Sequence, residues 1–208
     1  MKEEILEAIK KLREVSKKRN FVQTVDLIIN LQYLDVRRPE NRINEVLELP
    51  HGTGKEVRIV VFSDSLKDLD VPIITSAEIE KIASNKREAK KLARNTDFFL
   101  AEPSLMPVIG KHLGRYLAPR GKMPKVISGE VEKMIESLRK SVRLRIKDSP
   151  VIQCKVGSED MEDEKIAENI EVVLRFLAEK LPKGKNNIKN VLVKMTMSKP
   201  VKVEVRKW

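Results

Sequence analysis

The chain has 208 residues and carries 42 Lys and Arg against 31 Asp and Glu, a formal net charge of +11. This length suffices for one large or two small domains. The charge excess favours a polyanionic partner, either nucleic acid or an anionic membrane surface. No apolar run approaches the ~18 residues of a membrane span and the N-terminus has no apolar signal core, so we expect a soluble cytoplasmic protein. Cys154 is the single cysteine, which excludes an intrachain disulfide and a cysteine-based zinc site.

The first fifty residues predict a helix followed by two strands. Residues 3–19 repeat apolar side chains every three or four positions, with acids first and bases last, as in an amphipathic helix aligned with its dipole. Residues 21–31 alternate and predict a strand that has one polar face. On this pattern Phe21 lies with the apolar side chains. A second strand is expected over residues 45–49.

The middle of the chain alternates short apolar runs with helical patterns. Apolar runs of this kind are typical of a parallel sheet, and their alternation with helices implies βαβ crossovers in a Rossmann-like sheet. The elements expected here are strands at 57–62, 71–75 and 98–101, helices at 77–94 with Ser76 as N-cap, 104–116 and 130–140, and a strand at 142–146.

From residue 150 the first pattern returns, with strands expected at 151–156, 188–195 and 200–205 and a helix within 158–181. We therefore predict an α/β protein of two domains. Residues 1–56 and 151–208 would form a split α+β sandwich domain, and residues 57–150 an inserted Rossmann-like domain. Two crossing segments near residues 55 and 150 would form a double hinge. The alternative is one continuous sheet.

Residues 110–125 form a strongly basic stretch without a single acid. The first half keeps helical apolar spacing, whereas two prolines and a glycine exclude a regular helix or a central strand in the second half. A short helix that leads into a constrained basic loop is typical of a surface for a polyanion, and a solvated surface loop is the alternative. The basic side chains are Lys111, Arg115, Arg120, Lys122 and Lys125.

The common motifs of catalysis and cofactor binding are missing from the sequence. Residues 51–55 faintly suggest a phosphate-binding loop, but Leu49 stands where it needs Gly and Glu56 where it needs Ser or Thr. No G-x-G-x-x-G follows a predicted strand, which argues against a dinucleotide. The two histidines lack partners at ligand spacing, and Cys154 is expected to be a small buried residue. We expect no enzyme activity, metal or cofactor.

Several segments together resemble one known family. The string GRYLAPRGKMP at 114–124 is the most specific, and PHGTGKEVR at 50–58 is the second. Arg19-Asn20-Phe21 with Thr24, and Thr196-Met197 near the other end, complete a match that is in register over essentially the whole chain. The chain is similar to ribosomal protein L one, the family of the mobile stalk of the large ribosomal subunit, and resembles its archaeal branch most.

The resemblance implies a structural protein without catalysis. Members bind a helical element of large-subunit (23S) rRNA, form the stalk beside the exit site and assist tRNA release. Many members also bind a mimic of that element in their own mRNA and repress its translation. The implied partners are stalk rRNA, own-operon mRNA and, transiently, exit-site tRNA, without a membrane, for a protein that is a monomer outside the ribosome.

The resemblance also assigns the main RNA-binding surface to the split domain. The contacts that it implies are Phe21, Thr24, Asp26, Thr196, Met197 and Ser198. The last position is usually Gly in the family; a side chain there could crowd the approach of RNA, or its hydroxyl could add a hydrogen bond. By strand periodicity, Asn190 and Lys194 share the face of Thr196 and would flank it. The bare residue types place Phe21 and Met197 in the core more readily than on a stacking surface.

These residue types suit RNA because hydroxyls, amides and one carboxylate match 2′-hydroxyls and base edges in a shallow minor groove. Asp26 would repel phosphate, so we expect it to accept from a 2′-hydroxyl or to orient a lysine. The basic stretch at 110–125 would be a second, weaker surface for rRNA or tRNA. Two other classes stay open: a Rossmann-type nucleotide-binding enzyme, which predicts ligand-dependent melting, and a DNA-binding regulator, which competition between duplex DNA and structured RNA would separate.

Overall fold

The computed structural model describes residues 1–66 and 69–204 and confirms the α/β class. Its internal contacts divide the chain into two compact units. Residues 1–55 and 140–208 make the first, here called the split unit, and residues 56–139 make the second, the inserted unit. The strands lie in three separate sheets, so the alternative of one continuous sheet is wrong.

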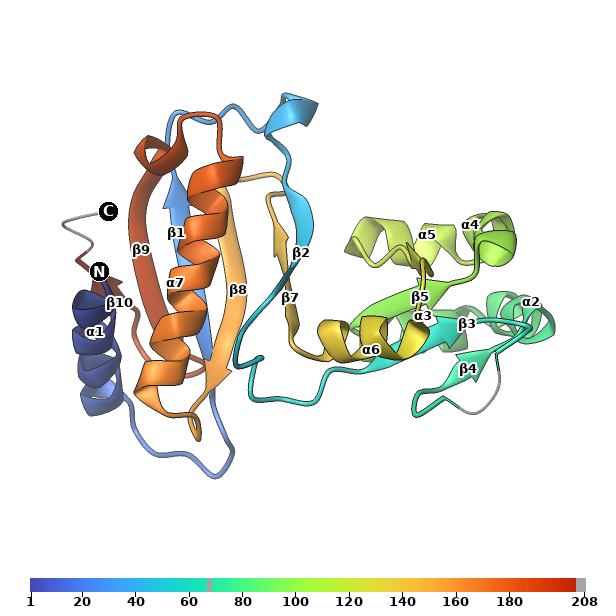
Figure 1. The fold of residues 1–208 in the computed structure, drawn as a ribbon, viewed down its shortest axis with the longest axis horizontal. Coiled ribbons are helices and arrows are strands. Elements are labelled where there is room, and N and C mark those ends of the chain that lie inside the picture. The colour runs from blue at the N-terminus through green and yellow to red at the C-terminus, as the bar shows by residue number, and fades with distance from the viewer. Residues whose placement is uncertain (67–68, 205–208) are drawn as a thin grey trace. The chain divides into compact units, whose positions relative to one another are not determined.

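The split unit is built on an antiparallel sheet of order β10-β9-β1-β8, which joins strands from both ends of the chain (Figure 1). A separate pair, β2 and β7, is also antiparallel. The elements are α1 (Lys2–Val15), β1 (Thr24–Leu31), the 3-10 turn η1 (Pro39–Asn41), β2 (Asn44–Glu48), β7 (Ser141–Arg145), β8 (Val151–Ser158), α7 (Asp163–Lys180), the 3-10 turn η4 (Gly184–Asn187), β9 (Ile188–Met195) and β10 (Val201–Val203). Residue 205, the expected end of the last strand, lies outside the described residues.

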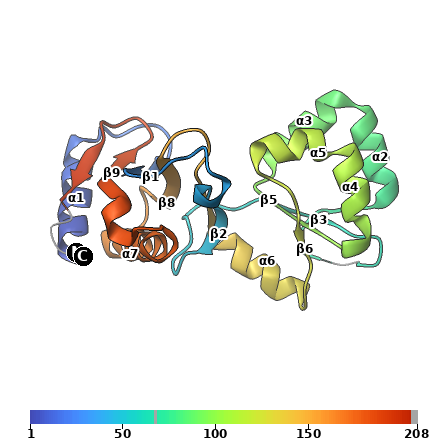
Figure 2. The same cartoon turned by 90° about the horizontal axis from the view of Figure 1, so that it is seen from above.

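The core of the split unit lies between this sheet and its helices (Figure 2). Strict alternation along β1 sends Val25, Leu27 and Ile29 inward, and each is fully buried. Apolar residues three and four positions apart on α1 and α7 meet them from the other side. The opposite face of β1, which carries Thr24 and Asp26, is therefore left only partly buried.

The inserted unit has a parallel sheet of order β4-β3-β5-β6, with α2 to α5 on one side and α6 on the other (Figure 2). Every residue of β3 and β5 is buried, as expected for strands covered on both faces. The elements are β3 (Ile59–Phe62), β4 (Ile73–Ile74), α2 (Ser76–Ser84), α3 (Lys86–Asn95), β5 (Phe98–Ala101), the 3-10 turn η2 (Pro103–Leu105), α4 (Met106–His112), α5 (Gly114–Leu117), the 3-10 turn η3 (Ala118–Arg120), β6 (Lys125–Val126) and α6 (Val131–Arg139).

Two expected helices are each divided in the structure. The helix predicted over 77–94 is two helices, because Asn85 has extended dihedrals and caps α3 by accepting a hydrogen bond from the Arg87 amide at 3.1 Å. Thr75, not Ser76, is the N-cap of α2 and forms a capping box with Glu78. The helix predicted over 104–116 is likewise split into η2, α4 and α5.

The second boundary between the units differs from the expected one at residues 150 and 151. It falls between Arg139 and Lys140, because β7 pairs with β2 of the split unit, with Glu48 opposite Ser141. The inward side chains of β7, Val142 and Leu144, join the core of the split unit. Local periodicity predicted this strand correctly but could not name its partner.

Candidate nucleic-acid interface

Two threonines that are 172 positions apart are locked side by side at one end of the split unit. β1 begins at Thr24, and the antiparallel register that pairs Val25 with Met195 carries the chain on to Thr196 next to it. Their Oγ1 atoms are 3.0 Å apart. The Thr24 amide donates to Thr196 Oγ1 at 3.1 Å, and the Thr196 amide donates to the Thr24 carbonyl at 3.1 Å. Both hydroxyls are thus fixed in position before any ligand arrives.

Asp26 lies one pleat further along the same face and is flanked by lysines on both neighbouring strands. It is opposite Lys155 on β8 and Lys194 on β9. Partial burial raises the pKa of Asp26, and the two lysines act in the opposite direction. The carboxylate therefore lies between two ammonium groups, and its expected role of orienting a lysine stays a prediction.

Phe21 and Met197 are exposed, so the expectation that they are core residues is wrong. Their exposed fractions are 51% and 61%, and Val22 beside Phe21 is 55% exposed. β1 starts only at Thr24, so the alternation that assigned Phe21 to the apolar side does not extend back to it. Met197 follows the end of β9 in a turn. Apolar surface therefore borders the hydroxyl pair.

Gln23 is a positioning residue that no motif in the sequence singles out. It is 1% exposed, and its Oε1 accepts from the Met197 amide at 3.2 Å. Its Nε2 reaches Ser16 Oγ and the Lys17 carbonyl, both at 3.3 Å, after the end of α1. The side-chain amide of Gln23 therefore connects the segment after α1 with the turn after β9. Its parity with Val25 was the available sign of burial.

Two other expected RNA contacts, Ser198 and Asn190, form hydrogen bonds within the protein. Ser198 Oγ accepts from the Met195 amide at 2.9 Å and closes the turn after β9, so it is engaged in place. Asn190 Oδ1 accepts from Asn30 Nδ2 at 2.6 Å, nearer the other end of the same strands. Phe21 stays a predicted contact and is exposed in the segment before β1. We call the other five expected contacts the threonine patch, which consists of Thr24, Asp26, Lys194, Thr196 and Met197.

The basic stretch of the inserted unit is less uniform than its sequence. Leu113 and Leu117 are buried, which fixes this segment against the core. Lys122 is half-buried and donates to the Thr96 carbonyl, so it anchors the loop instead of facing outward as expected. The exposed members of the set are Lys111, Arg115, Arg120 and Lys125.

The sheet of the inserted unit has its topological switch between β3 and β5, where open α/β sheets commonly bind ligands. Ser63 and Ser65, just after β3, both donate to the carboxylate of Glu102, just after β5. These bonds lower the pKa of Glu102 and keep it ionised. An ionised carboxylate thus engages both serine hydroxyls at this switch point, which does not favour the nucleotide-binding alternative.

Among residues 1–66 and 69–204, no three His, Cys, Asp or Glu side chains gather closely enough to hold a metal ion. Cys154 is buried as expected, and burial raises the pKa of its thiol to about 12. None of the helices in the described part of the chain has the length and apolar character to span a membrane.

These features define an α/β protein of two units with a fixed polar patch assembled from both chain ends. The chain belongs to the Ribosomal protein L1p/L10e family, whose model matches residues 11–199. It is 46% identical to the large ribosomal subunit protein uL1 of Pyrococcus horikoshii, over 98% of this chain and 96% of that protein. It is also 46% identical to that of Methanothermobacter thermautotrophicus (98% and 100%) and 44% identical to that of Thermococcus kodakarensis (98% and 98%). The resemblance to the archaeal branch is confirmed.

Proposed function

We propose that this protein is a structural component of the large ribosomal subunit and binds large-subunit (23S) rRNA through the threonine patch. Family membership and the names of the relatives support a ribosomal role. The net charge of +11 supports a polyanionic partner. The observation that carries the proposed site is the hydrogen-bonded pair of Thr24 and Thr196 beside exposed Met197.

The pair suits ribose because its hydrogen-bonding capacity is only partly used. Each threonine hydroxyl has one proton and two lone pairs, and the contact between Thr24 and Thr196 consumes one proton. The second proton can donate to a 2′-hydroxyl or a base edge in a shallow minor groove. Because the side chains are already immobile, little conformational entropy is lost on binding. Within the patch, Lys194 would attract phosphate, and the exposed Lys17, Lys18, Arg19 and Lys199 precede or follow its segments in the chain.

The finer roles come from the family and belong to the same proposal. In them the protein forms the mobile stalk beside the exit site, assists tRNA release, and represses translation by binding a similar element in its own mRNA. It acts in the cytoplasm as part of the ribosome and is a monomer outside it, without a cofactor. The exposed basic side chains of 110–125 make weaker contacts with rRNA or tRNA, so neutralising them leaves affinity for an isolated stalk-rRNA fragment nearly intact.

Substituting Thr196 tests the proposed site. Thr196→Ala removes a hydroxyl and an acceptor, and we expect affinity for a stalk-rRNA fragment to fall by about 2- to 10-fold, the worth of one hydrogen bond. Thr196→Ser keeps the hydroxyl and should bind nearly as wild type. Met197→Ala is a second test of the threonine patch. A side chain that is 61% exposed leaves no cavity when it is truncated, so the fold should not be disturbed. Gel-shift titration at two salt concentrations measures each affinity.

A single-lysine control separates specific contacts from charge. Lys199→Ala should reduce the slope of log affinity against log salt by about one and lower affinity less than Thr196→Ala does. Thermal melting of every variant verifies that the fold is retained. Wild-type affinity of Thr196→Ala in a folded protein would show that the patch is not the binding site.

A further inference from the structure

Tyr33 has an unusual backbone conformation for a large residue. Its φ is +57°, and it is the one non-glycine residue with positive φ among residues 1–66 and 69–204. This left-handed region is unfavourable for bulky side chains, and such strain concentrates at functional positions. The side chain is 74% exposed, so core burial does not offset the strain.

The segment next to Tyr33 is held by a set of hydrogen bonds that leaves its backbone little freedom. The Gln32 amide donates to the Asn187 carbonyl at 2.7 Å, and Asn187 Nδ2 donates back to the Gln32 carbonyl at 2.9 Å. Asn187 is fully buried, and its Oδ1 accepts from the Lys183 amide at 2.7 Å. The fold therefore imposes the strained conformation and keeps the ring at the surface.

One cationic side chain lies at this ring, and three more are on the loop that follows it in the chain. Lys183 Nζ lies 5.3 Å from the centroid of the Tyr33 ring. Arg37, Arg38 and Arg42 are exposed on the loop that follows. The loop is ordered by its own contacts: Asp35 accepts from the Arg37 amide at 3.0 Å, and Arg42 Nε donates to the Val36 carbonyl at 3.2 Å. We call Tyr33, Arg37, Arg38, Arg42 and Lys183 the tyrosine cluster.

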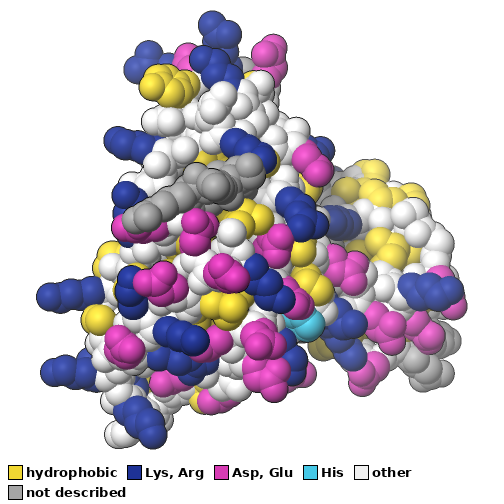
Figure 3. All heavy atoms as spheres, turned by 60° about the vertical axis from the view of Figure 1, so that its left-hand side comes forward, with side chains coloured by type: hydrophobic (Ala, Val, Ile, Leu, Met, Phe, Trp, Pro, Cys, Tyr) yellow, Lys and Arg dark blue, Asp and Glu magenta, His cyan; other side chains and the backbone are white. Residues whose placement is uncertain are grey.

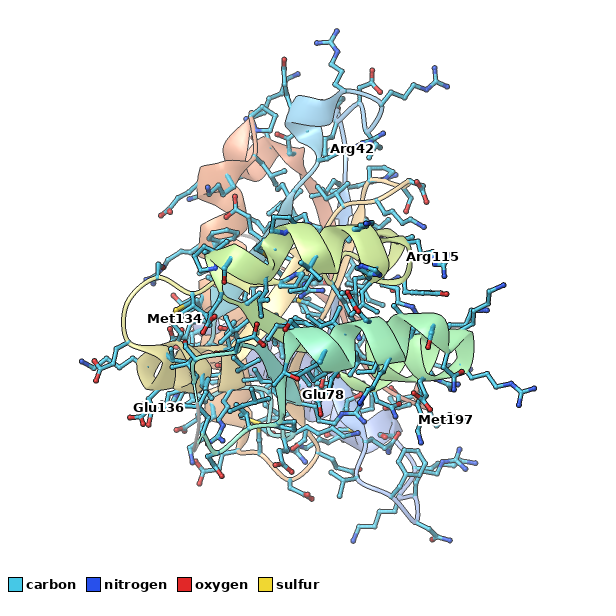
Figure 4. All side chains as sticks on the ribbon, turned by 90° about the vertical axis from the view of Figure 1, so that its right-hand side faces the viewer. Arg42, Glu78, Arg115, Met134, Glu136 and Met197 are labelled. Atoms are coloured by element: carbon cyan, nitrogen blue, oxygen red, sulfur yellow. The ribbon has the colours of Figure 1, made fainter. Side chains whose placement is uncertain are left out.

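The tyrosine cluster lies away from the threonine patch. β1 has eight residues, so its two ends are roughly 25 Å apart at about 3.3 Å per residue. Figure 4 shows Arg42 and Met197 at opposite ends of the split unit. Figure 3 shows Lys and Arg side chains projecting at the top, the end where β1 finishes. The loop also carries Asp35 and Glu40, but Asp35 is engaged by the Arg37 amide and lies 3.9 Å from Arg38.

We propose that the tyrosine cluster is a second RNA-contact surface, which stacks an unpaired base on Tyr33 and holds the adjoining phosphates with Arg37, Arg38 and Lys183. An exposed aromatic ring among cations is the arrangement that binds single-stranded RNA. Guanidinium groups on an ordered loop match phosphate oxygens with little loss of freedom. The inference does not rest on the threonine patch, because the two surfaces are built from different residues.

Two substitutions of Tyr33 separate strain from stacking. Tyr33→Asn places a residue that tolerates positive φ, so we expect the melting temperature to rise by about 2–4 °C. The same change removes the ring, so we expect affinity for an unstructured oligoadenylate of about 12 nucleotides to fall roughly 5-fold or more. Tyr33→Phe keeps the ring and should bind as wild type. Equal affinity of Tyr33→Asn and wild type for oligoadenylate overturns the proposal.

A charge-matched pair of variants tests the phosphate contacts. Replacing Arg37, Arg38 and Lys183 together by Ala keeps their backbone hydrogen bonds and should lower the salt slope for oligoadenylate by about two. Replacing exposed Lys90, Lys91 and Arg94 of α3 removes equal charge from the inserted unit and should keep the wild-type slope. Equal slopes for both triple variants would mean that the attraction is general, or that the cluster serves a protein partner, and would also overturn the proposal.

Thr196→Ala distinguishes this inference from the proposed function. It should leave oligoadenylate affinity unchanged while it weakens binding of the stalk-rRNA fragment. If Thr196→Ala weakens binding of oligoadenylate, the tyrosine cluster has been assigned wrongly. If it leaves binding of the stalk-rRNA fragment unchanged, the threonine patch has been assigned wrongly.

Discussion

At the scale of single residues, two neighbours on α7 fasten the segment that leaves the split unit. Asn169 is fully buried; its Oδ1 accepts from the His51 amide at 3.2 Å, and its Nδ2 donates to the Gly52 and Val156 carbonyls, both at 2.8 Å. Glu168 beside it accepts from Lys2 at 2.9 Å and contacts His51 Nε2. No partner for His51 was predictable from local spacing, because Glu168 lies 117 positions away.

The contacts of Glu168 predict a pH-dependent stability. The hydrogen bond from Lys2, followed by that from His51, lowers the pKa of Glu168 to about 2 in the folded state. A lowered pKa stabilises the fold while the group is ionised, fully so above the unfolded pKa of about 4.3, and this contribution is lost as the pH falls toward 2. The difference in free energy of unfolding between wild type and Glu168→Gln should therefore persist from pH 7 to about pH 5 and shrink toward pH 2.

Urea denaturation at a series of pH values measures this difference. Glu179→Gln, an exposed glutamate on the same helix, is the matched control and should follow wild type throughout. A Glu168→Gln difference that grows as the pH falls would contradict the assigned contacts.

Strand parity predicted that Thr24 shares a face with Asp26 and that Lys194 shares one with Thr196. The family resemblance implied that both segments form one surface, and the structure brings them together. The exposure of Phe21 and Met197 was not predictable in this way. Both lie just beyond a strand end, where alternation stops and the direction of a side chain depends on tertiary contacts such as the bond from the Met197 amide to Gln23 Oε1. For Gln23, parity with Val25 was the one sign of burial, and the residue type opposes it because polar residues in such a segment are usually solvated.

At the scale of elements, Asn85 shows how one residue divides a helical pattern. It ends α2 and caps α3, and its Nδ2 also donates to Glu88 Oε1 at 3.0 Å. Apolar spacing continues across this position, so periodicity alone predicted one helix. Asparagine competes for local backbone groups and favours caps over helix interiors, which is the signal that would have divided it.

Removing the cap should destabilise the inserted unit. Asn85→Ala loses the acceptor for the Arg87 amide, and we expect the free energy of unfolding to fall by about 1 kcal/mol. Asn85→Asp keeps an acceptor and should stay within a few tenths of wild type. Denaturant titration compares the two. An alanine variant as stable as wild type would show that the two helices are joined without penalty.

The strands were predicted well by position and less well by partner. Alternation or an apolar run marks β1, β5, β8 and β9 closely. The pairing of β7 with β2 joins segments about a hundred residues apart, and no local pattern encodes it. The same limit explains why the boundary between the units was placed too late in the sequence.

At the scale of the whole molecule, the two units have separate hydrophobic cores with no shared member among the described residues. The chain leaves and re-enters the split unit at nearly one place. The Leu49 amide donates to the Lys140 carbonyl at 3.0 Å, and a Cβ on Gly52 would lie 3.7 Å from Lys140 Cα. The inserted unit is therefore attached by two adjacent segments and can be removed without stretching the remainder.

A chain in which a short Gly-Ser linker replaces residues 56–139 should fold and bind the stalk-rRNA fragment with affinity close to that of the whole protein. We expect this because the core of the split unit and the threonine patch both stay intact in the shortened chain. Circular dichroism, cooperative melting and gel-shift titration check this expectation. Addition of Thr196→Ala to the shortened chain provides the control, and a loss of cooperative melting would contradict the independence of the two cores.

The joining of both chain ends in one sheet also has a consequence for biosynthesis. Thr24 leaves the ribosome well before its partner Thr196, which lies 172 positions later in the chain. A nascent chain can complete the inserted unit first, since domains fold as they emerge, whereas β1 waits for β8 and β9. A prematurely terminated product would keep most of the positive charge yet lack the paired hydroxyls. The split topology thus makes the finished surface depend on the translation of both segments.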